Sequence, residues 1–283
     1  MVHFNEEIRG DSFLKKLLWL FSICFIVSGC SSSLNESQQM SVTIFKIGKA
    51  NSILISYHDQ HVLIDTGKDD DAAEILNYLQ ENQIAKLHAL IITHFDKDHV
   101  GGADKIVEKI DIDNIYTANY ISDSKQTVQF KKVMAEKGLE PIMLIDTANI
   151  VLQDQTITLY PAEKSAYDGD NDYSIVATVD YQNISMLFAG DAEQKRLEEI
   201  LHNEQLARTY DFVKMPHHGR YNELTQSFVE VISPRYAVIT SSNKHIEDER
   251  TIHTLDAVGA EVYVTRNGDI KVITDGKTIN VKQ

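Results

Sequence analysis

The sequence predicts a single α/β domain with antiparallel hairpins in both halves, and three observations support this fold class. Short apolar stretches that alternate like strands are interleaved with segments whose apolar residues recur at helical spacing. Short polar turns join some of the strands in pairs, as in antiparallel hairpins. Neither an internal repeat nor a second composition divides the chain beyond residue 40.

The first half of the domain opens with three predicted strands and continues with alternating helices and strands. Between 70 and 82, Ile75, Leu76 and Leu79 fall on one side of a helix. Gly138 ends a later helix, because glycine is the usual residue just past a helix C-terminus. We expect strands at 42–47, 52–57, 61–64, 89–92, 114–118 and 142–145, and helices at 70–82, 101–110 and 127–137.

The second half contains the predicted hairpins. The Asn267-Gly268 pair is a strong two-residue turn signal, which predicts that the strands on either side of it pair with each other. We expect hairpins of 150–152 with 156–159, of 174–180 with 184–188 and of 261–265 with 270–274, further strands at 211–215 and 236–240, and helices at 192–202 and 248–258.

The N-terminal segment predicts export and lipid anchoring. Positive residues precede a short apolar run at 17–27, which is typical of a secretory signal. Small residues and then Cys30 follow, and this arrangement resembles a bacterial lipobox. We therefore expect a signal peptide at 1–29, a lipidated Cys30 and polar tether at 30–40, and a folded domain at 41–283 that is lipid-anchored to the cell membrane and faces outside the cytoplasm. An uncleaved anchor helix with an incidental cysteine is the alternative.

Cysteine content and net charge further limit the classes of protein that this chain can belong to. Cys24 and Cys30 are the two cysteines, so the domain has no thiol for a disulfide and depends on its core. The net charge of −15 falls on the domain, since the charges of the leader cancel. Such an acidic protein does not hold a nucleic-acid backbone by general electrostatics, which argues against a processive duplex-DNA enzyme. The charge is compatible with cleavage of a phosphodiester held by metal ions.

The stretch THFDKDHVGG at 93–102 is dense in candidate metal ligands. Its two histidines and two aspartates are His94, Asp96, Asp98 and His99. Imidazole and carboxylate together are the donors that bind divalent cations such as zinc. Because alternate residues of an extended loop face opposite ways, one such loop can serve two ions about 3.5–4 Å apart.

Other His and Asp residues also follow predicted strands directly. Asp65, Asp191 and the pair His217-His218 each come just after the end of a strand. Ligands in this position are held by a stiff sheet and converge at its edge. Taken alone, Asp65 also fits a turn cap, and Asp191 also fits a helix N-cap.

Four stretches, VLIDTG, THFDKDHVGG, LFAGDAE and KMPHHGR, resemble the metallo-β-lactamase fold superfamily in their order and spacing, over nearly all of residues 41–275. The chain is more closely similar to the hydrolase domain of ComEC-type competence proteins. Their entry segment corresponds to 47–52, and their Asn-rich segment corresponds to 171–174. The resemblance implies a four-layer αββα sandwich with one or two divalent metal ions.

The resemblance also implies which residues bind these ions and what they do. The ligands would be His94 and Asp96 for a first ion, Asp98, His99 and one of His217 or His218 for a second ion, and Asp191 bridging both. His218 is favoured because His-Gly is the commoner pairing in the superfamily, and His217 stays open. A metal-activated hydroxide would be the nucleophile, with Asp98 able to orient it as well as to bind metal.

Departures from the superfamily pattern bear on the metal. Asp96 stands where the metal loop usually has a second histidine, and no counterpart of the third histidine precedes Asp191. The first site is therefore rich in oxygen ligands, so Mn²⁺ becomes plausible beside Zn²⁺.

Further residues are expected around the metals. Asn171 and Ser174 either orient substrate or cap a turn, Arg220 either binds a substrate phosphate or faces solvent, and His245 is a weaker candidate for substrate binding. Gly101 and Gly102 would allow close backbone approach, with the helix after them directing its N–H groups at the site.

We interpret the chain as a lipid-anchored metal-dependent hydrolase of phosphodiesters, acting on single-stranded DNA or a nucleotide. One alternative is a hydrolase of a lactam, lactone or thioester, which the missing third histidine disfavours. The other is a binding protein that uses the metal cleft without catalysis. The sequence indicates no protein partner, and the membrane would be contacted through the N-terminal lipid.

Overall fold

Two β-sheets, one of eight strands and one of seven, form the centre of the computed structural model, which describes Met1 and residues 39–283. The predicted signal peptide, Cys30 and nearly all of the tether lie outside the described residues. The described residues from 39 onward belong to one structural unit. Within them, no helix is both long and apolar enough to span a membrane.

The eight-stranded sheet combines strands from both ends of the domain. Its strands are β1 (Met40–Ile44), β2 (Ile53–Tyr57), β3 (Gln60–Ile64), β4 (Lys86–Ile92), β5 (Asp111–Ala118), β6 (Ile142–Leu144), β14 (Ile270–Thr274) and β15 (Ile279–Lys282). Their spatial order is β15-β14-β1-β2-β3-β4-β5-β6. The run from β3 to β6 is parallel, and the other pairs are antiparallel.

The seven-stranded sheet is built from the second half of the chain. Its strands are β7 (Ala148–Leu152), β8 (Gln155–Tyr160), β9 (Val176–Tyr181), β10 (Ile184–Phe188), β11 (Phe212–Lys214), β12 (Tyr236–Ile239) and β13 (Glu261–Val264). Their spatial order is β13-β12-β11-β10-β9-β8-β7, with β10 to β13 parallel to one another.

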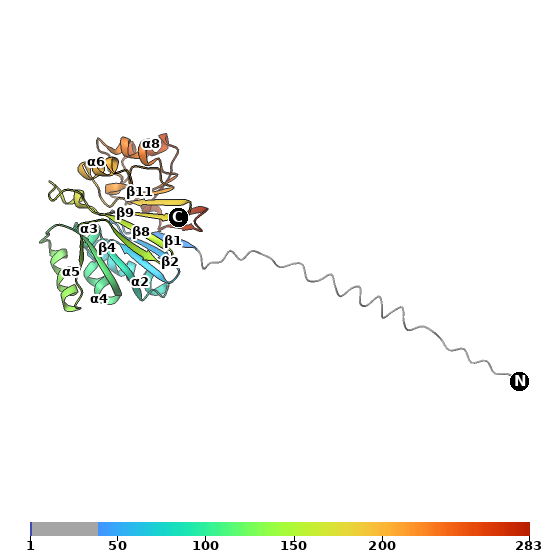
Figure 1. Cartoon of the computed structure of the whole chain (residues 1–283), viewed down its shortest axis with the longest axis horizontal. Helices are drawn as coiled ribbons and strands as arrows, with labels where there is room; N and C mark the ends of the chain where they lie inside the picture. The colour runs from blue at the N-terminus through green and yellow to red at the C-terminus, as the bar shows by residue number, and fades with distance from the viewer. Residues whose placement is uncertain (2–38) are drawn as a thin grey trace. The chain divides into compact units, whose positions relative to one another are not determined.

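Helices cover the outer face of each sheet. They are α2 (Ala72–Glu81), α3 (Lys97–Val100), α4 (Ala103–Lys109), α5 (Lys125–Glu136), α6 (Gln194–His202), α7 (Thr225–Ile232) and α8 (Glu249–Ala257), with short 3-10 turns η2 (Asp69–Asp71), η3 (Asp170–Tyr173), η4 (Pro216–Gly219) and η5 (Thr265–Asn267). Figure 1 shows α2, α4 and α5 on one side of the strands and α6 and α8 on the other. This arrangement confirms the predicted α/β class and the four-layer αββα sandwich.

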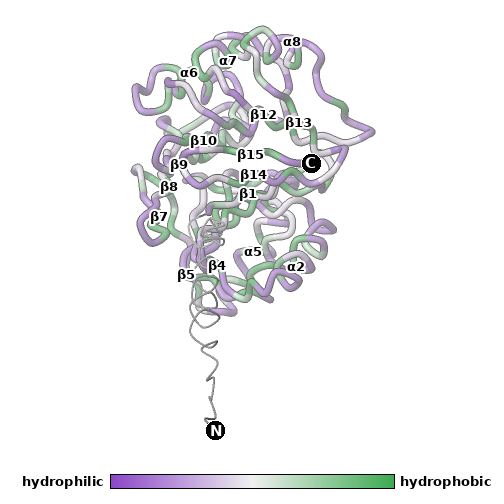
Figure 2. The backbone as a smooth tube through the Cα atoms, turned by 90° about the vertical axis from the view of Figure 1, so that its right-hand side faces the viewer, coloured by the Kyte–Doolittle hydropathy of each residue, from purple (hydrophilic) through white to green (hydrophobic). Residues whose placement is uncertain are grey.

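Alternation along the strands explains the layers. In β2, Ile53 and Ile55 join the core between the sheets, while Leu54 joins the core under α2, α4 and α5. In β10, Met186 faces the other sheet and Leu187 faces α6 and α7. Successive side chains of a strand point to opposite faces, so a run that is apolar at every position is buried on both sides. The hydrophobic colour of Figure 2 accordingly concentrates in the central strands.

The predicted hairpin of 261–265 with 270–274 is wrong. β13 pairs in parallel with β12, whereas β14 pairs with β1 and β15 in the other sheet. A two-residue hairpin turn needs positive φ, but Asn267 is not among the positive-φ residues and Gly268 is extended at φ 170°. The chain therefore crosses between the sheets at η5, and β15, which the sequence analysis did not predict, pairs with β14 instead.

Candidate metal centre

The candidate ligands meet where neighbouring strands end. Asp65 follows β3, His94 follows β4, Asp191 follows β10 after two residues, and His218 lies four residues past β11. The carboxyl ends of parallel strands share one edge of a sheet, and here one such edge from each sheet contributes. Residues far apart in sequence are brought together in this way.

Asp98, His99 and His218 form one side of the centre, which we call the Asp98 side. One potential ligand atom from each lies within 4.8 Å of the others. The Nε2 of His218 is 3.4 Å from Oδ2 of Asp98. His99 is fully buried and His218 nearly so, at 0% and 7% exposed. The resemblance implies these residues for the second ion: Asp98, His99 and one histidine of the pair at 217–218, which here is His218.

Asp191 lies between the imidazoles and is itself held on its other oxygen. Its Oδ2 is 3.0 Å from Nε2 of His218 and 3.3 Å from Nε2 of His99. Its Oδ1 accepts a hydrogen bond from Nδ2 of Asn51 at 2.8 Å and lies 3.3 Å from Nζ of the buried Lys214. The contacts with Asn51 and Lys214 fix the carboxylate so that Oδ2 faces the histidines.

His94 and Asp96 form the other side, which we call the Asp96 side. His94 is fully buried, and it can share an ion with His99 and Asp191, since their ligand atoms lie within 4.8 Å of one another. Oδ2 of Asp96 is 3.8 Å from Nε2 of His94, and its side chain is 44% exposed. The structure thus brings Asp96 beside His94 but leaves it in contact with solvent.

The residues present fit divalent metal ions. Among residues 39–283, the buried Nε2 atoms of His94 and His218 find no hydrogen-bond partner, although His218 lies beside Asp191. A buried polar atom without a partner is costly, and imidazole nitrogen next to carboxylate oxygen is the donor set of zinc and related ions. The ligand set agrees with the expectation of one or two ions.

Supporting contacts orient the histidines of the Asp98 side. Nδ1 of His99 lies 2.7 Å from Oδ2 of Asp65, and Nδ1 of His218 lies 2.7 Å from Oγ1 of Thr240. Such partners hold the ring orientation, so that the opposite nitrogen, Nε2, faces the candidate ligand group. Asp65 is in turn fixed by Thr93, whose backbone N donates to Oδ1 at 2.8 Å. Asp65 therefore lies at the site as a supporting residue, and it has a left-handed backbone, with φ 59°.

Charge in the centre favours ionised carboxylates. Burial alone raises the pKa of Asp98, but the hydrogen bond from His218 and the charge of His99 lower it overall. Asp191 behaves alike: burial raises its pKa, while His218, His99 and Lys214 lower it well below the usual range. Burial lowers the pKa of His99, whereas the carboxylates of Asp191 and Asp65 raise it, to about 10 overall.

The metal loop differs from the expected extended conformation. Only the part through Asp96 is extended, and α3 begins at Lys97. The glycines after it fit tight packing against the loop that follows β3. A Cβ on Gly101 would lie 2.7 Å from the backbone N of Asp69, and one on Gly102 would lie 2.6 Å from the carbonyl of Thr66. The close approach predicted for Gly101 and Gly102 is thus to this neighbouring loop.

Ser174 and Asn171 both make structural contacts beside the centre. Ser174 is fully buried, and its Oγ accepts from the backbone N of Asp191 at 3.0 Å. Gly190 has φ 55°, and a Cβ there would lie 2.8 Å from Cβ of Ser174, so glycine is needed at this contact. Asn171 closes the η3 turn, since its carbonyl accepts from Ser174 N at 3.1 Å. We therefore assign Ser174 a positioning role for Asp191.

His217, Arg220 and His245 line a pocket beside the cluster, which we call the rim pocket. Its volume is about 230 Å³, and it is lined by Lys49, His217, His218, Arg220, His245, Ile246 and Asp248. His217 lies outside both ligand groups, with its Nδ1 2.8 Å from Oε1 of Glu193. Burial lowers the pKa of His217 to about 4, with Arg220 and Lys49 acting in the same direction, so the contact with Glu193 is a hydrogen bond of a neutral ring.

Four residues of the centre, Asn51, Thr93, Lys214 and Thr240, were not predicted as site residues. Asn51 donates to Asp191 and accepts from Thr240 Oγ1 at 2.9 Å, and Lys214 is 1% exposed beside Asp191. Asn51 lies in the entry segment that carried the family resemblance, and Lys214 is the first residue of KMPHHGR. These motifs marked the segments, but neither showed which side chain turns inward.

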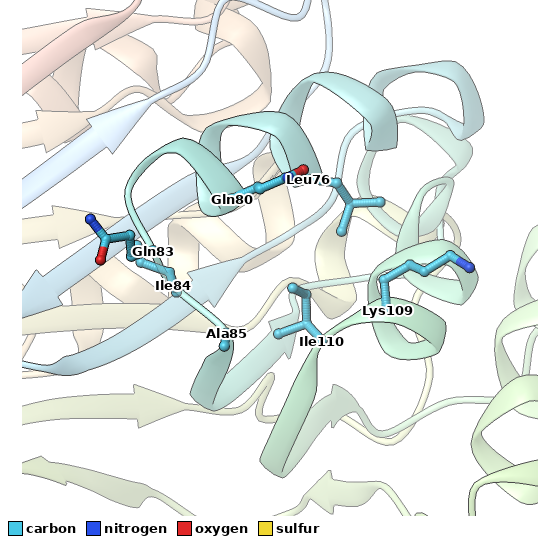
Figure 3. A pocket seen from close by; sticks show the side chains of 7 residues that line it. All are labelled: Leu76, Gln80, Gln83, Ile84, Ala85, Lys109 and Ile110. Atoms are coloured by element: carbon cyan, nitrogen blue, oxygen red, sulfur yellow. The ribbon is translucent and has the colours of Figure 1, made fainter.

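A larger hollow lies away from the centre, on the helical layer of the first sheet. Figure 3 shows its lining of Leu76, Gln80, Gln83, Ile84, Ala85, Lys109 and Ile110, and its volume is about 530 Å³. None of these residues is a candidate metal ligand, so the chemistry belongs to the centre and not to the larger hollow.

Comparison with known proteins identifies the family. The model of the metallo-beta-lactamase superfamily matches residues 46–241. The chain belongs to this superfamily. It is 23% identical over 261 residues to ComE operon protein 3 of Bacillus subtilis (strain 168), covering 83% of this chain and 33% of that protein. It is 28% identical over 205 residues to Competence protein ComA of Neisseria gonorrhoeae, covering 72% of this chain and 27% of that protein.

A solved structure agrees with this assignment at the level of the fold. The metallo-beta-lactamase fold protein YhfI from Bacillus subtilis superposes with a TM-score of 0.58 at 13% identity, over 86% of this chain and 100% of that one. The predicted resemblance to the superfamily and to competence proteins is confirmed. The chain thus has a metal-dependent hydrolase fold and a candidate His/Asp metal-binding group, and it spans about a third or less of the curated relatives it matches.

Proposed function

We propose that the protein is a metal-dependent hydrolase that cleaves phosphodiester bonds. The observation that carries this proposal is the convergence of His99, Asp191 and His218 on one point, with Asp98 beside it. Two features favour a phosphodiester over a carbonyl substrate. The Asp96 side offers a carboxylate where a histidine-rich site would have imidazole, and oxygen ligands suit the harder ions used in phosphoryl chemistry. The cations Lys49 and Arg220 also line the adjoining rim pocket.

The ligands of this proposal divide between the two sides. Asp98, His99 and His218 would hold one ion, His94 and Asp96 the other, and Asp191 would contact both. Bound Zn²⁺ or Mn²⁺ would acidify an attacking water and neutralise charge on the phosphate. The chain's own contribution is orientation: Asp65, Thr240 and Asn51 fix the ligand side chains before substrate arrives.

Asp98 has a further role in this proposal. Its side chain is 19% exposed, against 4% for Asp191, so it can reach both the centre and an incoming substrate. Its lowered pKa keeps it ionised at neutral pH, so it can accept a hydrogen bond from the attacking water.

We also propose the cellular setting from the sequence. A lipid on Cys30 would tether the domain to the outer face of the cytoplasmic membrane, where single-stranded DNA or nucleotides would be its substrates. Metabolic labelling with a fatty-acid analogue tests this directly, because a Cys30→Ser variant would lose the label.

The function is tested with the full-length chain purified in detergent and dialysed against Mn²⁺ or Zn²⁺. We expect turnover of bis(p-nitrophenyl) phosphate and of single-stranded DNA, with a loss of at least about a hundredfold in Asp98→Asn. Absence of turnover with either metal would contradict the proposal. Hydrolysis of a chromogenic cephalosporin alone would instead indicate carbonyl chemistry, and less than one tightly bound ion per chain would favour a binding protein.

A further inference from the structure

The rim pocket lies directly against the metal centre. His218 lines it, and the Nε2 of the same ring lies 3.0 Å from Asp191. Three separate loops supply the other walls: Lys49 comes from the connection of β1 to β2, Arg220 follows η4, and His245 lies in the loop after β12. The backbone of His245 is held by Ser242, with N–O distances of 3.0 Å in both directions, so this wall is a small closed loop.

The two cations of the rim pocket have no acidic partner. Across residues 39–283, no carboxylate lies within 4.0 Å of the side-chain nitrogens of Lys49 or Arg220. The one carboxylate that lines the pocket, Asp248, is occupied by Arg250, with Oδ2 2.7 Å from Nη2. Lys49 and Arg220 are therefore two cations without a directly paired carboxylate in the lining of the pocket.

This local charge contrasts with the protein as a whole. The chain has 42 acidic and 27 basic residues, a net charge of −15, so a pocket lined by two basic side chains and one already paired carboxylate differs in charge from the protein as a whole. Two unpaired cations that converge on one pocket beside a hydrolytic centre are an anion site by their chemistry. The pocket, at about 230 Å³, has room for a phosphate and part of the group attached to it.

We propose that the rim pocket binds a second phosphate of the substrate, next to the phosphodiester being cleaved, through Lys49 and Arg220. This inference rests on the proposed function and deepens it. The preferred substrate is then a nucleotide chain with a phosphate on the adjoining nucleotide, rather than an isolated diester. Arg220 offers a planar fork for two phosphate oxygens, and Lys49 adds a point charge. The exposed Ile246 lies at the same pocket and offers an apolar contact to the sugar or base.

The test compares three thymidine dinucleotides on the Mn²⁺-loaded full-length protein in detergent: one without a terminal phosphate, one with a 5′-phosphate and one with a 3′-phosphate. We expect one of the phosphorylated forms to have a kcat/KM about tenfold higher than the unphosphorylated form, chiefly through a lower KM. The two phosphorylated forms distinguish which neighbour occupies the pocket. Arg220→Gln and Lys49→Gln should each reduce this ratio towards one, whereas a Lys271→Gln variant, which removes the same charge at an exposed position outside the pocket, should retain it.

The outcomes separate the inference from the proposed function. Equal cleavage of all three dinucleotides, or a preference that persists in both pocket variants, overturns the inference and leaves the hydrolase function standing. Cleavage of none of them by the wild-type protein overturns both. Thermal unfolding midpoints of the two pocket variants that match that of Lys271→Gln would show that a lost preference is not a folding defect.

Discussion

The Asp98 side and the Asp96 side of the centre differ in how firmly their ligands are held. His99 and His218 each have a partner at 2.7 Å on Nδ1. On the other side, Nδ1 of His94 is 3.2 Å from Oγ1 of Thr93 and 3.5 Å from Oγ of Ser174. Asp98 is 19% exposed, whereas Asp96 is 44% exposed.

This difference indicates that the two sides would bind their ions with different affinities. A ligand fixed by its surroundings loses little freedom on binding metal, whereas an exposed side chain must be ordered first. We therefore expect the Asp98 side to provide the tighter site and the Asp96 side to bind its ion only at higher metal concentration.

The largest effect is expected from His218, one of the two histidines of the Asp98 side. His218→Asn should abolish the tight ion and reduce activity by more than the roughly 10–100-fold typical of supporting residues. His217→Asn is the matched control, because both histidines are buried and both have positive φ, which Asn tolerates. Elemental analysis should show loss of metal in the first variant and retention in the second. Equal metal loss in both would contradict the division between the two histidines.

A smaller effect is expected from Asp65, whose carboxylate orients His99. Asp65→Asn should weaken the tight ion roughly 10–100-fold, measured by chelator competition, because a neutral amide is a weaker acceptor for Nδ1 of His99 than the carboxylate. Asn suits the left-handed backbone of Asp65, so the fold should be kept. If Asp65→Asn binds metal like the wild type, the Asp98 side is not preorganised by this contact.

The sequence predicted much of the centre because its ligands lie in short motifs at strand ends. Local spacing placed His94, Asp96, Asp98 and His99 in one loop, and the apolar strands before Asp191 and His218 pointed to the same edge. The layers followed from strand alternation, which is a local property. These features depend on neighbours in sequence, so sequence reasoning reaches them.

Contacts between distant segments were out of reach. The Asn267-Gly268 signal favours a hairpin, but β14 buries Ile270 and Val272 against β1 across the domain. The chain forms this long-range pairing instead of the hairpin. Asn51 and Lys214 are ordinary polar residues until the fold brings them to Asp191. The family resemblance favoured His218 over His217, but the physical reason, the left-handed turn of η4 that directs His218 to the cluster, is visible only in the structure.

Metal binding on the Asp98 side should depend on pH. Burial lowers the pKa of His99, but Asp191 and Asp65 raise it to about 10, so the metal-free ring is protonated at neutral pH. An ion must displace that proton, so its apparent affinity should rise with pH, by about tenfold per unit below the pKa. Calorimetry in buffers of different ionisation enthalpy should show about one proton released per ion at pH 7. Binding without proton release would show that His99 is already neutral or is not a ligand.

The smallest effect is expected on the Asp96 side, and it separates the two sites most cleanly. Asp96→Ala should weaken only the second, looser ion, by about tenfold or less, since the exposed carboxylate is one of several donors there. Asp96→His should strengthen that ion for Zn²⁺ relative to Mn²⁺, because imidazole is the softer ligand. Two-phase metal titrations measure both effects, and the tight phase should stay unchanged in each variant. A shift of the tight phase in Asp96→Ala would mean that Asp96 serves the Asp98 side, so the two sides form one site rather than two of unequal strength.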